Sequence, residues 1–240
     1  MHLKSRIIAE SLWYFLGGAL ALFAAVRYGI PVLLEQYGVR PLVGWWLTSG
    51  AMFVVFFVAA LLAARAQFGA TSLAQVLLAL NIRHLSKADA LWAAGGLGAV
   101  VALTAIVVAV CDRLFSINLL SQDSYTSFLR MEKLKPEEFW LFLAWMPYFF
   151  FNIVGEELLW RGYLLPRQAG TLGRYAWAFN GFLWAVFHVG IGWRLAILLL
   201  PIEFIVPYVV QRRMNTWIGI LIHGVYNGSG FVMVALGVVS

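Results

Sequence analysis

Seven long apolar runs constrain this chain more than any other feature. A helix needs roughly 20 mostly apolar residues to cross the hydrocarbon core of a bilayer. Runs of this kind lie at 7–26, 44–64, 90–110, 139–155, 175–190, 194–211 and 216–238. Hydrophobic residues make up 62% of the 240 residues and charged residues 12%, an apolar excess that a soluble fold of this size does not enclose. We therefore expect an all-α, polytopic bundle of seven transmembrane helices, or eight if 28–40 or 156–166 also enters the membrane.

The apolar runs follow one another closely, which indicates one membrane-embedded domain over residues 1–240. Residues 7–26 follow Lys4 and Arg6, as in a signal peptide, but their length favours a retained first helix over a cleaved signal. Residues 71–80 are expected to form a short helix on the inner surface. The fourth span is expected to remain helical to about Leu165, where Pro166 and Gly170 break it.

Basic residues lie mostly in the short segments between apolar runs, so the net charge of +6 reflects membrane topology rather than binding to nucleic acid. With the N-terminus in the cytoplasm, ten basic residues fall in inner segments and seven in outer ones. The inner ones are Lys4, Arg6, Arg65, Arg83, Lys87, Arg161, Arg167, Arg174, Arg212 and Arg213; the outer ones are Arg27, Arg40, Arg113, Arg130, Lys133, Lys135 and Arg194.

The second half of the chain places ionisable residues inside apolar runs, where each costs a few kcal/mol and usually has a function. Glu157 and Arg161 lie four residues apart on one helix face, with the acid first, which predicts an ion pair. Glu156 points about 100° away and has no cation on its own helix. A carboxylate in such an apolar site suits a general base, and Asn152, one turn earlier, can orient it. Ordinary charges at an interfacial helix end are the alternative.

Two further segments carry polar groups that can act with Glu156. His188 ends an apolar run, one turn after Trp184, and taken alone it fits a packed, hydrogen-bonded histidine. His223 and Asn227 share a helix face and can donate towards a common point, although a polar contact between helices is the plainer explanation. Together the three segments supply a base, a group that positions water and donors for an oxyanion, as peptide hydrolysis requires.

The segment 139–230 resembles the glutamate-type intramembrane proteases of the CAAX-processing and bacteriocin-processing (CPBP, Abi-like) family. Glu156, Glu157 and Arg161 match the motif of two glutamates, three residues and arginine. His188 matches the histidine of the second motif, in which Trp184 stands where the family has phenylalanine. His223 and Asn227 match the third motif. No motif is found in residues 1–138, whose helices have no assigned role.

The resemblance implies that Glu156 and His188 activate water, that His223 and Asn227 form the oxyanion hole, and that Glu157 and Arg161 are structural. It implies no cofactor, and a substrate that is a membrane-associated protein or peptide cleaved near its C-terminus or membrane segment. Trp184 is expected to reshape the substrate pocket, which argues against a prenyl-protein substrate. The small size suggests the cytoplasmic membrane of a prokaryote, and the sequence does not indicate an oligomeric state.

Three alternatives remain open. Glu156, His188 and His223 can form a two-histidine, one-carboxylate zinc site, although no His-Glu-x-x-His motif is present. A non-catalytic immunity or scaffold protein can share the fold. A transporter is favoured only by Glu203, which lies between Pro201 and Pro207 and would sit beside backbone carbonyls freed by a broken helix; no inverted repeat supports it.

Overall fold

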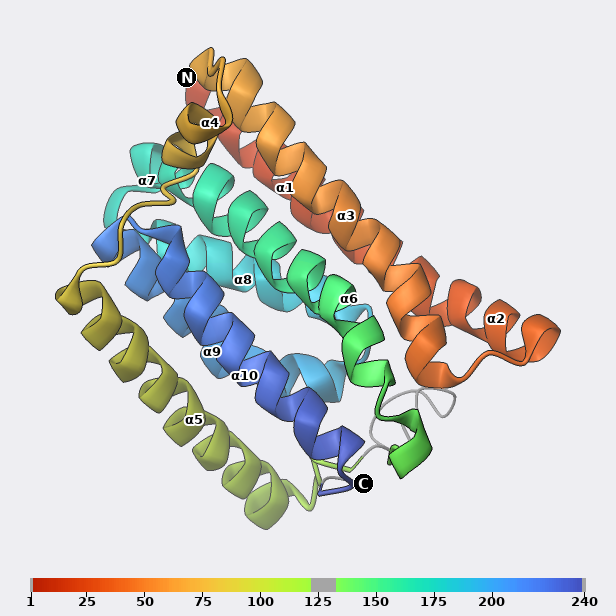
Figure 1. The fold of residues 1–240 in the computed structure, drawn as a ribbon. Coiled ribbons are helices and arrows are strands. Elements are labelled where there is room, and N and C mark those ends of the chain that lie inside the picture. The colour runs from red at the N-terminus through yellow and green to blue at the C-terminus, as the bar shows by residue number, and fades with distance from the viewer. Residues whose placement is uncertain (1, 122–132, 239–240) are drawn as a thin grey trace.

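The computed structural model describes residues 2–121 and 133–238, and its regular elements there are all helices (Figure 1). The first half holds α1 (His2–Ala24), the π-helical turn η1 (Ala25–Gly29), α2 (Ile30–Tyr37), α3 (Pro41–Phe68), α4 (Leu73–Ala79) and α5 (Lys87–Phe115). The second half holds η4 (Pro136–Glu138), α6 (Leu141–Glu156), the π-helix η5 (Glu157–Leu164), α7 (Leu165–Leu172), η6 (Gly173–Tyr175), α8 (Ala176–Val189), α9 (Trp193–Arg213) and α10 (Thr216–Ala235). The expected all-α class is confirmed.

All seven expected spans are helical, and five helices within the described residues are long and apolar enough to cross a membrane. These five are Lys4–Tyr37, Pro41–Phe68, Lys87–Phe115, Trp193–Arg213 and Thr216–Ala235. The other two expected spans are α6 and α8, which have 16 and 14 residues and are short for a bilayer on their own. The chain is an integral, multi-pass membrane protein. Neither 28–40 nor 156–166 adds an eighth span, because the first continues α1 and the second continues α6.

The bundle has two ends. The end that we call the N-terminal end holds the starts of α1, α5, α8 and α10, the ends of α3 and α9, and both α4 and α7 (Figure 1). The far end holds α2, the start of α3, the ends of α5 and α10, and the start of α6. A backbone bond from Thr216 to Asn81 ties the first end, and one from Leu134 to Ala235 ties the second.

The first helices are part of the core, although the sequence assigned them no role. Phe15 of α1 is fully buried and stacks on Trp160 of η5, with ring centroids 4.0 Å apart. Glu10 of the same helix bonds to Tyr163 and Arg167. The predicted helix at 71–80 is present as α4, and Ser72 caps it together with Gln75. These helices hold the second half in place.

Two helix predictions were wrong, and both concern prolines. The fourth span does not end near Leu165: it stays helical to Leu172, with Pro166 in the first turn of α7, and ends at Gly173 with φ +59°. Nor do the prolines break α9, which runs unbroken through Pro201 and Pro207. Pro166 occupies the first turn of α7, where its missing N–H costs little, and in α9 each proline removes one backbone donor without ending the helix.

Candidate functional site

The expected site residues lie on α6, η5, α8 and α10, which meet beside α9. Gly181 allows α8 to lie close to α9, because a Cβ there would lie 2.6 Å from the backbone oxygen of Glu203 in α9. All eight residues of η5 are buried. Its π-helical turns differ from the regular helix expected from the sequence, and such turns often occur at functional sites.

Glu156 lies at the deep end of a large cavity and accepts hydrogen bonds from two neutral donors. Its Oε1 accepts from Nδ2 of Asn152 at 2.9 Å, and its Oε2 accepts from Nε1 of Trp184 at 2.7 Å. Glu156 is only 1% exposed, and it lines the cavity. No ion pair to Glu156 is found among the described residues. The expected orientation by Asn152 is present, while the bond from Trp184 was not foreseen.

Trp184 is not among the residues that line the cavity, and its expected effect on the substrate pocket stays a prediction. It is buried, and the guanidinium of Arg161 lies 3.6 Å from the centre of its ring. Its indole N–H donates a hydrogen bond to Glu156, whereas a phenylalanine at this position has no donor. The substitution of tryptophan for the family's phenylalanine thus adds a donor to the carboxylate.

His188 lines the same cavity and is held from behind by Glu203. Its Nδ1 lies 2.9 Å from Oε1 of Glu203 and 3.2 Å from the backbone oxygen of Trp184. Both partners are acceptors, so Nδ1 carries the proton and Nε2 is the nitrogen left for the cavity. Glu203 is fully buried. Its role in the site was missed from the sequence, although an acid inside an apolar helix was the signal for it.

Glu157, next to Glu156, has entirely different surroundings. It is fully buried, does not line the cavity, and its Oε1 lies 3.0 Å from Nδ1 of His223 and 3.3 Å from a guanidinium nitrogen of Arg161. Gly219 of α10 leaves room for it, because a Cβ there would lie 2.3 Å from Oε2. The predicted pair of Glu157 and Arg161 is therefore present, with His223 as a third member.

His223 and Asn227 bond to each other instead of pointing to a common acceptor. Nδ2 of Asn227 lies 2.9 Å from Nε2 of His223. Both ring nitrogens of His223 are therefore engaged, one with Glu157 and one with Asn227. Asn227 lines the cavity and His223 does not. An amide nitrogen has two hydrogens, so Asn227 keeps one donor for a molecule in the cavity.

The cavity has a volume of about 1130 Å³ and runs from Glu156, His188 and Asn227 towards the far end of the bundle. Aromatic side chains from α3, α6 and α10 form much of its wall. Among them are Trp45, Trp46, Trp145, Tyr148, Phe149 and Phe231. The site thus joins a buried carboxylate, an oriented imidazole and an amide donor to an apolar chamber, which is suited to an apolar polypeptide segment.

Residues 138–229 match the family model described as type II CAAX prenyl endopeptidase, Rce1-like. The chain contains an Rce1-like domain. The expected protease core at 139–230 coincides with it, and the resemblance to the CAAX-processing family is confirmed. Every motif residue named above lies inside the Rce1-like domain, and α1 to α5 lie outside it. No curated protein and no solved structure matches the chain.

The arrangement of the possible ligand side chains can be compared with what a zinc site requires. Within residues 2–121 and 133–238, no group of three or more His, Cys, Asp or Glu side chains is arranged to hold a metal ion. His223 would have to give up its bond to Asn227 or to Glu157 to become a ligand. The residues of the Rce1-like domain therefore fit a metal centre poorly.

Proposed function

We propose that the protein is a glutamate-type intramembrane endopeptidase without a metal cofactor. Its substrate is a membrane-associated protein or peptide, cleaved near its C-terminus or its membrane segment. The observation that carries this proposal is that Glu156 and His188, from separate helices, both line one apolar cavity. A non-catalytic scaffold or immunity protein does not require a buried carboxylate and an oriented imidazole that both line a cavity of this size.

In the proposed reaction a water molecule lies between Glu156 and Nε2 of His188. Glu156 accepts a proton from the water as the water oxygen attacks the carbonyl carbon of the scissile bond. The tetrahedral intermediate collapses as the C–N bond breaks, and the leaving amine takes the proton from Glu156. The two donors on Glu156, an amide and an indole, are neutral, and they fix the orientation of its carboxylate.

The oxyanion of the intermediate is proposed to accept a hydrogen bond from the second N–H of Asn227. An amide donor fixed in place before the reaction stabilises the developing charge at no cost of reorganisation. His223 is expected to act through Asn227 rather than on the substrate, because both of its ring nitrogens are bonded. Glu157 and Arg161 then fix the orientation of His223.

Glu203 is proposed to be a positioning residue for His188. Its bond to Nδ1 selects the tautomer that turns Nε2 towards the cavity, and a carboxylate at this place stabilises the imidazolium if His188 takes up a proton. This role uses the buried acid that the transport hypothesis required. An unbroken α9 lacks the broken helix that this hypothesis invoked, and each proline frees only the one carbonyl that loses its N–H donor.

The test is to identify cleavage products. The purified protein is reconstituted into vesicles with a library of peptides that carry an apolar segment of about 20 residues, and the products are identified by mass spectrometry. We expect new termini within or beside the apolar segment with the wild type and with Glu35→Gln, a matched change at an exposed glutamate. Glu156→Gln should give none. Equal products from wild type and Glu156→Gln would refute the proposed base.

A further inference from the structure

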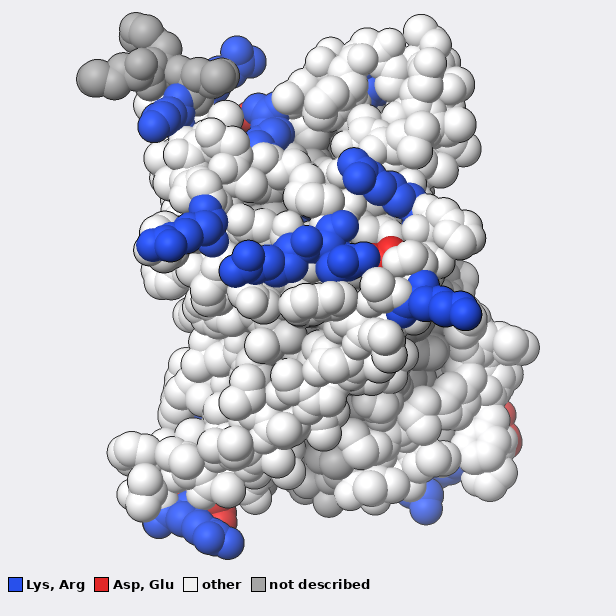
Figure 2. All heavy atoms as spheres, turned by 90° about the vertical axis from the view of Figure 1, so that its left-hand side faces the viewer, with Lys and Arg blue, Asp and Glu red and all other residues white. Residues whose placement is uncertain are grey.

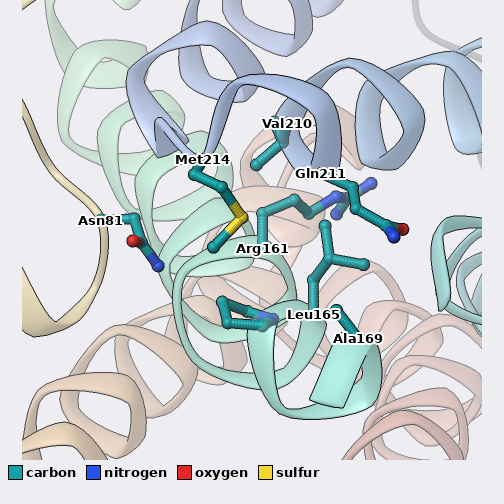
Figure 3. Close-up of a pocket in the computed structure, with 8 residues that line it drawn as sticks. Asn81, Arg161, Leu165, Ala169, Val210, Gln211 and Met214 are labelled. Carbon is teal, nitrogen blue, oxygen red and sulfur yellow. The ribbon is translucent and has the colours of Figure 1, made fainter. Parts of the chain in front are cut away.

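As far as the described residues show, the cavity extends from the site towards one end of the bundle. Its lining residues come from the half of the bundle near the far end, and its rim there carries Asp112, Arg113 and Asn118. Towards the N-terminal end the site is closed by η5, against which Leu80 packs: a Cβ on Gly162 would lie 2.9 Å from the Leu80 backbone oxygen. The cavity beside Arg161 on that side has a volume of about 10 Å³, room for a single water molecule at most (Figure 3).

Charge distinguishes the same two ends. The N-terminal end carries nine basic residues and two acidic ones, and each of the acids bonds to an arginine: Glu10 to Arg167 and Asp89 to Arg213. Figure 2 shows Lys and Arg side chains across this part of the surface. The nine are Lys4, Arg6, Arg65, Arg83, Lys87, Arg167, Arg174, Arg212 and Arg213. Arg161, which the sequence count placed among them, is buried within the bundle.

The far end is nearly balanced in charge. Its described residues include six basic side chains and four acidic ones. The basic ones are Arg27, Arg40, Arg113, Lys133, Lys135 and Arg194, and the acidic ones are Glu35, Asp112, Glu137 and Glu138. The backbone N–H of Lys135 and the side chain of Arg40 lower the pKa of Glu138, so this acid stays ionised at neutral pH. Arg130 lies outside the described residues.

We infer that the catalytic cavity opens to the extracytoplasmic side of the membrane. Basic residues gather on the cytoplasmic side of membrane proteins, which places the N-terminal end inside and the mouth of the cavity outside. This inference rests on the proposed function for the substrate it names: an apolar segment of an exported, membrane-anchored polypeptide. A substrate displayed on the cytoplasmic face would meet the closed side of the site.

The depth of the cavity sets how many residues of an extended substrate fit between the site and the rim. Thr104 lies 3.3 Å from the hydroxyl of Tyr226, next to Asn227, and marks the level of the site on α5. Arg113, at the rim, is nine residues further along the same helix, which is about 14 Å at 1.5 Å per residue. An extended peptide covers this depth with about four residues. The scissile bond is therefore followed or preceded by about four apolar residues, with a polar group at the rim.

Thiol labelling tests the direction of access. Cys111 is the one cysteine of the chain, so Cys111→Ala gives a background without thiols. Single cysteines are then introduced by His84→Cys at the N-terminal end, Glu137→Cys at the far end and Ala109→Cys in the cavity wall. In intact bacterial cells, a maleimide that does not cross membranes should label Glu137→Cys and Ala109→Cys. His84→Cys should react only after the cells are permeabilised, and denaturation should make all three react equally.

A pair of reporters tests the substrate. One anchors a soluble domain on the outer face through an apolar segment, and the other anchors it on the inner face. We expect release of the outer domain only, and none from either reporter with Glu156→Gln. Labelling of His84→Cys but not Glu137→Cys in intact cells would overturn the outward-facing cavity, whatever the activity. Expected labelling without cleavage of either reporter would instead count against the proposed protease.

Discussion

Glu156 and Glu157 are neighbours in the sequence and are both buried, yet they lie in opposite environments. Glu156 faces a cavity of about 1130 Å³ and is held by two neutral donors. Glu157 does not line that cavity and contacts Arg161 and His223. Beside Arg161 there is space for one water molecule at most. One peptide bond thus separates a carboxylate that can reach a substrate from one that cannot.

The difference shows how a membrane protein keeps several charges in its interior. A buried charge is tolerated when it is paired and hydrogen-bonded, and Glu157 has both kinds of contact. Glu156 has no ion pair among the described residues, and its proposed role as the base accounts for its placement. The residues around Glu157 also help to position Glu156. Arg161 packs on the ring of Trp184, and the indole N–H of Trp184 donates to Glu156.

The largest expected effect is the loss of folded protein when Glu157 is changed. Glu157→Gln leaves Arg161 without a counter-charge in a fully buried place. Removing one partner of a buried pair costs about 3–5 kcal/mol, so the thermal unfolding midpoint and the folded yield in detergent should fall. Glu35→Gln should change neither. A Glu157→Gln protein that is fully stable but inactive would show that the catalytic role had been given to the wrong glutamate.

In the cavity, Asn227→Ala should lower kcat by about 10²–10³-fold, the usual cost of one oxyanion donor. KM should change little, because the bond forms in the transition state and not with the bound substrate. His223→Ala should act in the same way, and the double change should cost less than the two effects added, because the pair acts as one unit. A raised KM at constant kcat would make Asn227 a substrate contact instead.

A smaller effect is expected behind His188. Glu203→Gln keeps the volume and removes the charge, so turnover should fall about 10–100-fold, as for other residues that orient a functional histidine. The pH profile of kcat/KM should also change, which distinguishes positioning from a simple loss of folded protein. An unchanged pH profile with lower folded yield would make Glu203 a structural residue.

No effect at all is expected from metal removal. Strong chelators should leave turnover unchanged, and purified protein should contain far less than one zinc per chain. Stoichiometric zinc that is lost together with activity would contradict the glutamate mechanism. It would favour Glu156, His188 and His223 as ligands, with the bonds of His223 rearranged.

The parts of the fold and site that follow from local spacing were predictable from the sequence. Apolar runs located the seven helices, and the four-residue spacing predicted two contacts that the structure contains: Glu157 with Arg161, and Asn152 with Glu156. Both contacts lie within one helical turn, where the geometry depends little on the rest of the chain.

Contacts between helices were not predictable in this way. His188 meets Glu203 across 15 residues, and His223 meets Glu157 across 66. Such pairs depend on how α8, α9 and α10 pack, which spacing along one helix does not determine. The continuation of the fourth span through α7 was missed because Pro166 was taken as a break, whereas it occupies the first turn of α7.

Glu156 is assigned to the reaction and Glu157 to the fold. The most direct test measures turnover per folded molecule for Glu156→Gln, Glu157→Gln and Glu35→Gln in the same vesicles with the same peptide. Glu156→Gln is not expected to unfold the protein, because the amide oxygen can still accept from Nε1 of Trp184, and the amide nitrogen can donate to Oδ1 of Asn152 once that side-chain amide turns over. For this variant we predict wild-type unfolding with turnover reduced about 10²–10⁴-fold, the range for a lost general base. For Glu157→Gln we predict lower stability with turnover largely retained per folded molecule, because the amide oxygen can still accept from Nδ1 of His223. The reverse pattern would contradict the assignment.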